Sequence, residues 1–373
     1  MMAPTPFARR LHTEVWISFT ICLLGACSTG ADGDSHFAID SAGITIVANA
    51  DADLLEPEAC RVQIAATPML ETGVASGDAN YQLHRVSGAT RLGNGNVVVA
   101  NSGSHELKQY DAAGRFIRKG GGFGEGPGEF KGLDWIALQR GDTIVTFDTR
   151  LNRIAVFDSS LSFVRTVTLA VGDMETAMNP VALDVFDDGT YLASSMIRPQ
   201  AGLGGMVRTD VYLLRFQADG QHADTIGVFP GRELTVSTGV ILHPPFERTT
   251  QFVPYNELLY VAPQDEYQIE RYDQTGELET LIRKPHDNAL ITDEHLEAVR
   301  WPAQAPQPHS TMPAYESVLI DPLRYLWVLE FAVPGDQAGA MSVFDPEGRF
   351  LCTVHLAERF TPLEVGVDYL LGV

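Results

Sequence analysis

MSVFDPEGRFLCTV (341–354) and LKQYDAAGRFIRK (107–119) share one pattern: apolar residues, an aromatic residue, Asp, two further residues, Gly and a second alternating strand. The pattern recurs with substitutions in IAVFDSSLSFVRTV (154–167), LLRFQADGQHADTI (213–226) and IERYDQTGELETLI (269–282). Each copy predicts two strands joined by a tight turn, in which Asp caps the turn and Gly supplies a positive φ. The copy at 154–167 has Ser162 in place of Gly, so we expect its turn to differ.

The spacing of these copies predicts the architecture. Their aromatic residues Tyr110, Phe157, Phe216, Tyr272 and Phe344 lie 47, 59, 56 and 72 residues apart. A minimum of about 45 residues with variable additions is typical of propeller blades that carry loop insertions. An apolar strand precedes each copy, and a sixth strand stands at the end: NVVVANS (96–102), TIVTFDT (143–149), TYLASSM (190–196), LLYVAPQ (258–264), YLWVLEF (325–331) and DYLLGV (368–373). A weaker innermost strand precedes each of these. We therefore expect an all-β, six-bladed propeller with four-stranded antiparallel blades, of which the sixth is only half supplied.

A propeller has to close, because an open ring exposes apolar faces and strand edges. The spare strands are ITIVANA (44–50) and CRVQIAA (60–66), and we expect the second to close the sixth blade. The alternative is that the natural chain continues past Val373 with the missing strand. Helix is expected only in the N-terminal leader and in the segment 292–301, where Thr292 can act as a cap.

Two stretches resemble a known family. FDTRLNRIAVFD (147–158) resembles the NHL repeat, and GRFIRKGGGFGEGPGEFKGL (114–133) resembles the signature of the bacterial six-bladed β-propeller lipoprotein family, within the NHL-like and TolB-like propellers. The resemblance covers roughly residues 40–373 and implies the fold more strongly than any activity. WD-type and kelch propellers fit less well, since no blade ends in Trp-Asp and no paired glycines occur at kelch spacing.

The N-terminus indicates export. Arg9 and Arg10 precede the apolar run 15–26, which is too short to span a bilayer as a helix and ends in Leu-Gly-Ala before Cys27. This resembles a lipobox, so we expect residues 1–26 to be a lipoprotein signal peptide, Cys27 to carry lipid, 27–41 to be a flexible tether and 42–373 to be one propeller domain. An ordinary signal peptide with an incidental Cys is the alternative. Ser28 implies, by analogy with the class, the outer membrane of a bacterial cell envelope rather than the inner one.

Composition excludes one class of partner. The chain has 26 Lys+Arg against 48 Asp+Glu, a net charge of −22 over 373 residues, which argues against nucleic acid. Nothing in the sequence indicates more than a monomer. Cys60 and Cys352 would remain in the exported protein, either as two separate thiols or as a disulfide.

Three insertions supply the candidate binding site. Segments 197–210, 229–250 and 285–313 lengthen connections that we expect to stand on one face, at the mouth of the central channel. They bring together arginines and aromatic residues, which suit an anionic or sugar-like ligand or a protein contact. The expected ligand-binding residues are Arg198, Arg208, His243, Arg248 and Trp301, with Phe246 nearby, and Glu125 and Glu129 from the glycine-rich run on the other side.

Several candidates have a structural alternative. Residues 124–130 can be a blade connector whose glycines fit the backbone, and Asp148 and Arg153 can simply stabilise the 148–153 turn. The positions equivalent to Asp148 are Asn101, Ser195, Gln264 and Phe331, which do not form a ring of identical ligands.

Enzymatic activity is less favoured than binding. His105, His243 and His309 could serve a lyase-type metal site, and Glu125, Asn179 and Asp184 could hold Ca at the channel mouth, but neither set has the order or context of the propeller enzymes that use such residues. We therefore expect a lipid-anchored binding module for a small ligand, glycan or envelope protein, with no catalytic residues, no metal and no cofactor. A Ca-dependent lactonase, hydrolase or lyase and a scaffold in an envelope complex are the alternatives.

Overall fold

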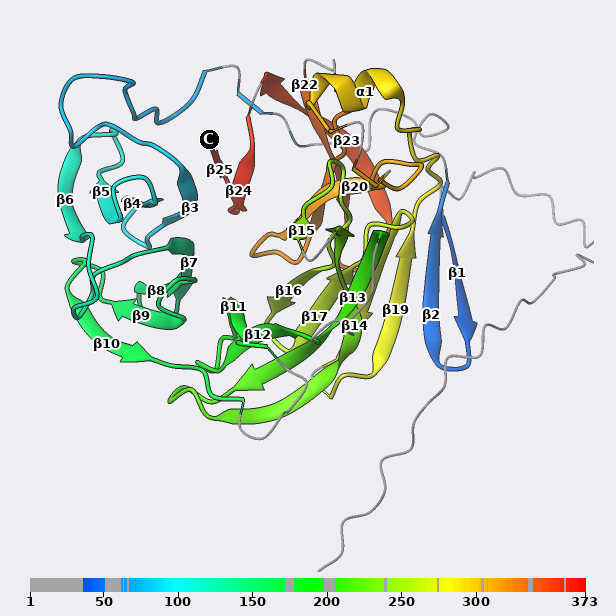
Figure 1. Ribbon diagram of the computed structural model, residues 1–373, viewed down its shortest axis with the longest axis horizontal. Coiled ribbons are helices and arrows are strands. Elements are labelled where there is room, and N and C mark those ends of the chain that lie inside the picture. Colours follow the sequence, from blue (N-terminus) through cyan, green and yellow to red (C-terminus); the bar gives the residue numbers. More distant parts are fainter. Residues whose placement is uncertain are drawn as a thin grey trace, which may run out of the picture. The chain divides into compact units, whose positions relative to one another are not determined.

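The computed structural model describes residues 36–50, 62, 64–65, 67–171, 178–197, 205–237, 240–273, 275–302, 305–306, 308–334, 338–358 and 360–373. The chain from Ser35 to Val373 forms one compact unit. Figure 1 shows its sheets arranged in a ring. Within the described part, no helix has the length and apolar character needed to span a membrane.

The ring is a β-propeller of antiparallel blades. Blade one contains β3 (Val86–Arg91), β4 (Val97–Asn101), β5 (Glu106–Tyr110) and β6 (Phe116–Gly121), and blade two contains β7 (Leu133–Gln139), β8 (Thr143–Asp148), β9 (Arg153–Phe157) and β10 (Phe163–Val167). Blade three contains β11 (Val181–Val185), β12 (Tyr191–Met196), β13 (Gly205–Phe216) and β14 (His222–Ser237), followed by β15 (Val240–Leu242). Blade four contains β16 (Gln251–Tyr255), β17 (Leu258–Ala262), β18 (Gln268–Tyr272) and β19 (Leu278–Arg283), and blade five contains β20 (Tyr315–Ile320), β21 (Leu326–Glu330), β22 (Ala338–Phe344) and β23 (Phe350–Glu358).

The described residues form five complete blades, not six. The last two strands, β24 (Pro362–Val365) and β25 (Leu370–Gly372), make a two-stranded sheet between blades five and one. Val365 packs with blade five, and Leu371 packs with blade one. The predicted half-blade is therefore present.

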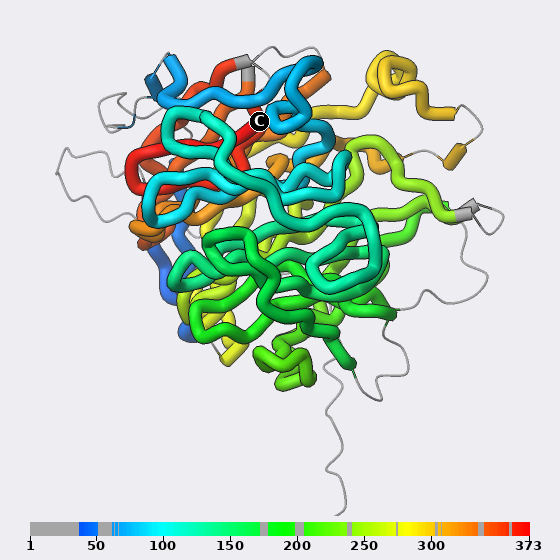
Figure 2. The backbone as a smooth tube through the Cα atoms, turned by 90° about the vertical axis from the view of Figure 1, so that its left-hand side faces the viewer, coloured from blue at the N-terminus to red at the C-terminus, as the bar shows by residue number. Residues whose placement is uncertain are grey.

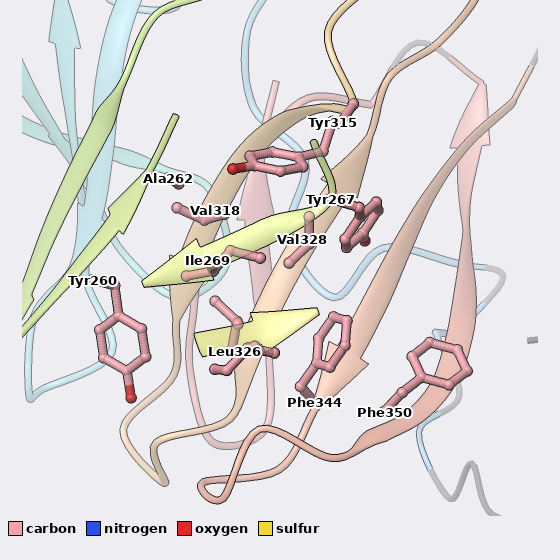
Figure 3. Packing of buried hydrophobic residues seen from close by; sticks show 12 residues of the cluster. Tyr260, Ala262, Tyr267, Ile269, Tyr315, Val318, Leu326, Val328, Phe344 and Phe350 are labelled. Carbon is pink, nitrogen blue, oxygen red and sulfur yellow. The ribbon is translucent and has the colours of Figure 1, made fainter. Parts of the chain in front are cut away.

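The cores lie between neighbouring blades. Each repeat aromatic enters such a core: Tyr110, Phe157, Phe216 and Phe344 are fully buried, and Tyr272 is partly buried. Figure 3 shows the cluster between blades four and five, where Tyr267, Tyr315 and Phe344 lie close together. The rings of Tyr267 and Tyr315 are 5.3 Å apart, edge to face. Alternation along each strand thus places side chains against both adjacent sheets.

The expectation of a different turn at 158–162 is wrong. In every repeat copy the Asp or Gln at the turn start donates its amide to the carbonyl four residues later, and the fourth residue donates back to it. Leu161 takes the position that Gly114, Gly220, Gly276 and Gly348 hold elsewhere, with φ +59°. The residue equivalent to the glycine is therefore Leu161 and not Ser162, which is the next residue along the chain.

Closure of the ring also differs from the expectation. Of 60–66, the structure describes Val62, Ile64 and Ala65, and none of them lies in a strand. Instead, the irregular segment 67–85 covers blade one beside the short sixth sheet. Lys108 Nζ donates to the carbonyls of Ala79 (2.7 Å) and Gln82 (2.9 Å).

The N-terminal strands join a different blade. β1 (His36–Ser41) and β2 (Ile44–Asn49) form a hairpin, and β2 pairs in parallel with β19, the outer strand of blade four. The last six residues of the expected tether therefore form β1. Asn49 is buried and bonds to the carbonyls of Arg283 and Gly348 and to the amide of Phe350, so it joins blade four to blade five.

Two smaller expectations are settled. The helix expected at 292–301 is confirmed as α1 (Asp293–Ala298), whose cap Thr292 accepts from the His295 amide. Cys352 on β23 is disulfide-bonded, so its interpretation as a free thiol is wrong. Cys60 lies outside the described residues, and its pairing with Cys352 stays a prediction.

Candidate functional site

One buried polar side chain holds the chain as it enters each of the first four blades. Asn101 Oδ1 accepts from the His84 amide (2.7 Å), Asp148 Oδ2 from the Lys131 amide (2.6 Å), and Gln264 Oε1 from the Thr249 amide (2.7 Å). Ser195 Oγ donates to the Met178 carbonyl (2.6 Å). These are the positions that the sequence grouped with Asp148. Their shared task is structural, and it requires a polar group rather than one residue type.

β-Bulges occur near the start of most innermost strands, at the channel mouth. Five of the six innermost strands have a register shift near their start, at Ser87, Asp134, Leu183, Glu316 and Leu363. Bulges redirect side chains, and they are common at barrel rims and beside functional sites. Burial raises the pKa of Asp134, and Arg232 on β14 partly offsets the effect. Burial also raises the pKa of Glu316. Both side chains are nevertheless exposed, so the mouth carries accessible carboxyl groups.

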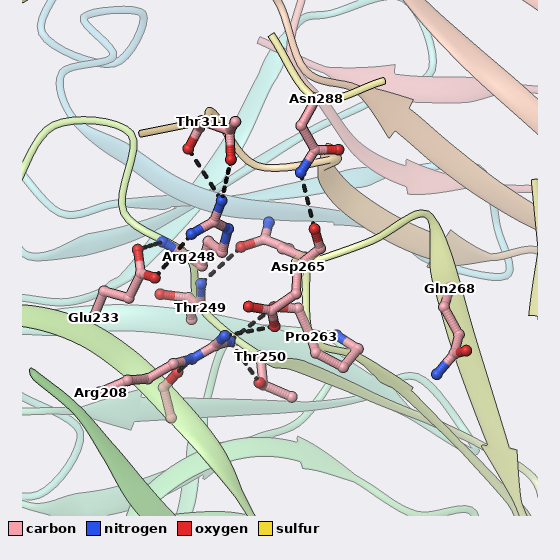
Figure 4. Close-up of polar contacts among 12 residues, drawn as sticks. Arg208, Glu233, Arg248, Thr249, Thr250, Pro263, Asp265, Gln268, Asn288 and Thr311 are labelled. Carbon is pink, nitrogen blue, oxygen red and sulfur yellow. Dashed lines mark hydrogen bonds and ion pairs between the residues drawn. The ribbon is translucent and has the colours of Figure 1, made fainter. Parts of the chain in front are cut away.

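The insertions stand on this same face, which we call the insertion face. In Figure 2 the segment with α1 and the ends of β14 and β15 project on the same side of the ring. They are fastened to one another by two arginines from the predicted site, which are shown in Figure 4.

Arg208 joins blade three to blade four. Its Nη1 forms an ion pair with Asp265 Oδ2 (2.6 Å), and its Nη2 donates to the Pro263 carbonyl (2.7 Å) and to Thr250 Oγ1 (3.2 Å). Its Nε donates to the Gly231 carbonyl (2.9 Å). Only 16% of the side chain is exposed, so most of its donors already have partners within the protein.

Arg248 is placed differently from the expectation. The residue is 2% exposed, and its Nη1 pairs with Glu233 Oε1 at 3.1 Å. Its Nη2 donates to the carbonyl and hydroxyl oxygens of Thr311 (3.1 and 2.7 Å). Because Glu233 is also buried, this pair closes the base of the 229–250 insertion out of reach of solvent, and the bonds to Thr311 fasten it to the next insertion. The expected surface contact is therefore replaced by a structural role.

The other predicted residues lie at different depths. His243 is exposed on the insertion face, and its Nδ1 is 3.2 Å from Glu247, which also pairs with Arg232. Trp301 is half-buried and donates its indole N–H to the Pro306 carbonyl (3.3 Å). The ring of Phe246 lies 6.3 Å from those of His295 and Phe331. Arg198 lies outside the described residues.

The glycine-rich run is a tightly held connector. Arg153 donates to the carbonyls of Glu125, Gly126 and Glu129, and Glu129 Oε2 accepts from the Gly126 amide (2.8 Å). A Cβ on Gly124 would lie 2.0 Å from Glu129 Oε2, so a larger residue there would displace the Glu129 carboxylate. Glu125 is exposed and forms an ion pair with Lys131, which lowers its pKa. Glu129 thus serves the loop, and of the two carboxylates only that of Glu125, already paired with Lys131, is exposed to solvent.

A cavity of about 350 Å³ opens on the insertion face beside Asp265. It is lined by residues 265–268 and by Arg283, Lys284 and 286–288, all from blade four and its exit. Lys284 Nζ donates to Glu330 (2.9 Å) and to Ser342 (2.7 Å), which fixes one wall. Burial lowers the pKa of His286, although Glu330 opposes the shift, so the imidazole favours its neutral form. No motif in the sequence predicted this cavity.

The candidate metal sets do not assemble. In the described ranges, no group of three or more His, Cys, Asp or Glu could hold a metal ion. Asp184 lies on β11 and, among the described residues, accepts a hydrogen bond from the Val185 amide alone (2.8 Å), and burial raises its pKa to about 7. His105 packs against Phe123 at 5.1 Å. That the protein uses no cofactor stays a prediction.

Comparison with known proteins gives similar folds only. No protein-family model matches the sequence, and no curated protein matches it. An exported protein described as putative, from Bacteroides fragilis, is 13% identical with a TM-score of 0.49, covering 81% of this chain and 82% of that one. A DUF4221-family member from Bacteroides vulgatus is 10% identical with a TM-score of 0.47, covering 79% and 88%. A catalytically inactive virginiamycin B lyase from Staphylococcus aureus, solved with quinupristin, is 12% identical with a TM-score of 0.38, covering 77% of each chain. The propeller assignment rests on strand pairing rather than on these similarities.

Proposed function

We propose that this chain is a binding module of the bacterial cell envelope. It would be anchored by a lipid on Cys27, in the outer membrane rather than the inner one. It would be a monomeric propeller of the six-bladed lipoprotein type, related to NHL-like and TolB-like propellers, with β24 and β25 standing for the sixth blade. Its ligand would be a small molecule, a glycan or an envelope protein, held on the insertion face.

One observation carries this proposal: the insertions form a single fixed surface. Arg208 links residues 231, 250, 263 and 265, and Arg248 links residues 233 and 311. Loops that merely covered the channel would not need these hydrogen bonds from one insertion to the next. A surface fixed before binding loses less conformational entropy when a ligand arrives, and this favours affinity.

The exposed groups on that surface suit mixed recognition. Arg232 and His243 provide hydrogen-bond donors, while Leu290, at 67% exposure, and Val299 provide apolar contact. Trp301 presents part of an indole ring beside them. Aromatic and arginine side chains of this kind are frequent in protein and sugar recognition.

Site-specific photo-crosslinking tests the position of the site. A photoreactive residue is placed at Leu290 on the insertion face or, as a matched control, at Val164, which is 56% exposed on the outer strand β10. The full-length protein is then irradiated in envelope membranes and on a glycan array. We expect adducts at 290 that are absent at 164. Equal labelling at both positions, or none at 290, would contradict the proposal.

The anchor is tested separately. Cys27→Ala should abolish labelling by radioactive palmitate and shift the protein from the membrane fraction to the soluble envelope fraction. Unchanged labelling of this variant would show that Cys27 is not the lipidated residue.

A further inference from the structure

One arginine occupies a backbone position that glycine holds almost everywhere else in this chain. Eight five-residue turns share the same pair of backbone hydrogen bonds, and their fourth residue always has a positive φ. Six of these residues are glycines, namely Gly95, Gly114, Gly189, Gly220, Gly276 and Gly348. The other two are Leu161 and Arg324, with φ of +59° and +71°.

A side chain is disfavoured in this left-handed region, so its presence calls for a compensating interaction. For Leu161 the compensation is visible, because the residue is 5% exposed within the core between blades one and two. Arg324 is exposed, and its side chain makes no hydrogen bond or ion pair with any described residue. Nothing in the described part of the protein therefore explains Arg324 at this position.

Arg324 lies at a cavity of about 620 Å³, a volume typical of small-ligand sites. The cavity is lined by turns that join the first and second strands of blades two to five, at the end of the channel opposite to the insertion face. We call this end the turn face. Tyr255 links two of these turns by donating to the Pro322 carbonyl (2.8 Å).

The two other arginines of the cavity are already paired. Arg140 pairs with Asp187 (3.1 Å), and Arg215 pairs with Asp188 (2.6 Å) while lying 4.6 Å above the ring of Phe186. Burial alone would raise the pKa of Asp188, but hydrogen bonds from Thr190 and Arg215 outweigh it and hold the carboxyl ionised. Arg324 is therefore the unpaired cation of this cavity.

The remaining lining consists of an apolar floor, two carboxylates and Asn256. In the floor, Phe186 and Leu259 are buried, whereas Leu258 and Ile226 are partly exposed. Glu257 and Asp273 have no ion-pair partner among the described residues, although Asp273 accepts hydrogen bonds from the amides of Thr275 and Glu277. These two negative charges disfavour a second anionic group on any ligand.

We propose that the turn face binds a small organic monoanion with an apolar body. Its carboxylate or similar group pairs with the guanidinium of Arg324, which offers planar, two-point hydrogen bonding. Its body lies on the partly exposed side chains of Leu258 and Ile226. This site is independent of the insertion face, and its failure would leave the function proposed there untouched.

Titration calorimetry with the full chain at pH 7 tests the proposal. The probes are 1-naphthylacetate, the neutral 1-naphthylacetamide, and acetate, which together separate the charge from the apolar body. We expect naphthylacetate to bind at least about tenfold more tightly than either other probe, as a charge-assisted pair implies.

Arg324→Gly supplies the decisive variant, because glycine is the residue of six equivalent turns and the fold should tolerate it. It should remove the preference for naphthylacetate while leaving the melting temperature equal or higher, and Arg324→Asn should do the same. Arg324→Lys should keep part of the preference. Arg150→Ala, which removes an exposed arginine near the 148–153 turn, should change nothing.

Three results would overturn the proposal. They are equal affinity of Arg324→Gly and the parent for naphthylacetate, equal affinity of the parent for the acid and the amide, and no binding of naphthylacetate by the parent at millimolar concentration.

Discussion

Replacing Arg248 by Met should destabilise the propeller strongly, although the residue lies within a proposed binding surface. Met retains much of the side-chain volume but removes the partner of Glu233 Oε1 and the donor to Thr311. Glu233 is 5% exposed, so its carboxylate would be left buried with only the Arg248 backbone amide as a described partner. Breaking one side of a buried ion pair costs about 3–5 kcal/mol.

This cost translates into a measurable shift. Unfolding entropy is about 2.1 cal/mol/K per residue, which gives roughly 0.7 kcal/mol/K for the unit Ser35–Val373. The melting temperature of Arg248→Met should therefore fall by about 4–7 °C, as followed by circular dichroism at pH 7. Adding Glu233→Met should restore most of the lost melting temperature, since removing both partners leaves no buried charge without a partner. A loss under about 1 °C in the single variant would refute the reasoning.

Two further predictions concern pH and the disulfide. Burial raises the pKa of Asp184 to about 7, above the unfolded value of about 3.9, so its contribution to stability is greatest at low pH and is lost as pH rises through 7. Asp184→Asn should therefore melt higher than the parent at pH 8 and lose most of this advantage near pH 4, and a gain independent of pH would contradict it. Cys352→Ser should lower stability by about 2–5 kcal/mol in thermal melts. If Cys60 is the partner, Cys60→Ser should cost the same and the double variant no more, whereas additive losses would exclude that pairing.

Much of the blade pattern is readable in the sequence because it is local. A strand, a five-residue turn and a strand are specified within about 14 residues, as in 341–354, and the aromatic residue marks the core. Leu161 shows the limit of this reasoning. A turn set by backbone hydrogen bonds accepts a leucine when tertiary burial offsets the strain, and the sequence window does not reveal that burial.

The closing segment and the site depend on contacts that are distant in sequence. Residues 44–50 and 60–66 are both spare apolar strands by pattern, yet β2 adds to blade four, while an irregular segment covers blade one. Composition drew attention to the arginines of the insertions, but it did not distinguish Arg208 and Arg248, which have partners, from Arg324, which has no ion-pair or side-chain hydrogen-bond partner among the described residues. Only the fold shows which acids stand opposite each guanidinium group.

The pairing of β2 with β19 sets an order for folding. Asn49 bonds to groups 234 and 299 residues further along the chain. At a synthesis rate of about 5–20 residues per second, this first hairpin would wait roughly 10–50 s before its partner strand exists. During that time the edge of the apolar strand ITIVAN is open to pairing with other chains. Slow formation of such a long-range parallel contact makes the nascent chain, rather than the finished ring, the form most exposed to aggregation and most dependent on a chaperone.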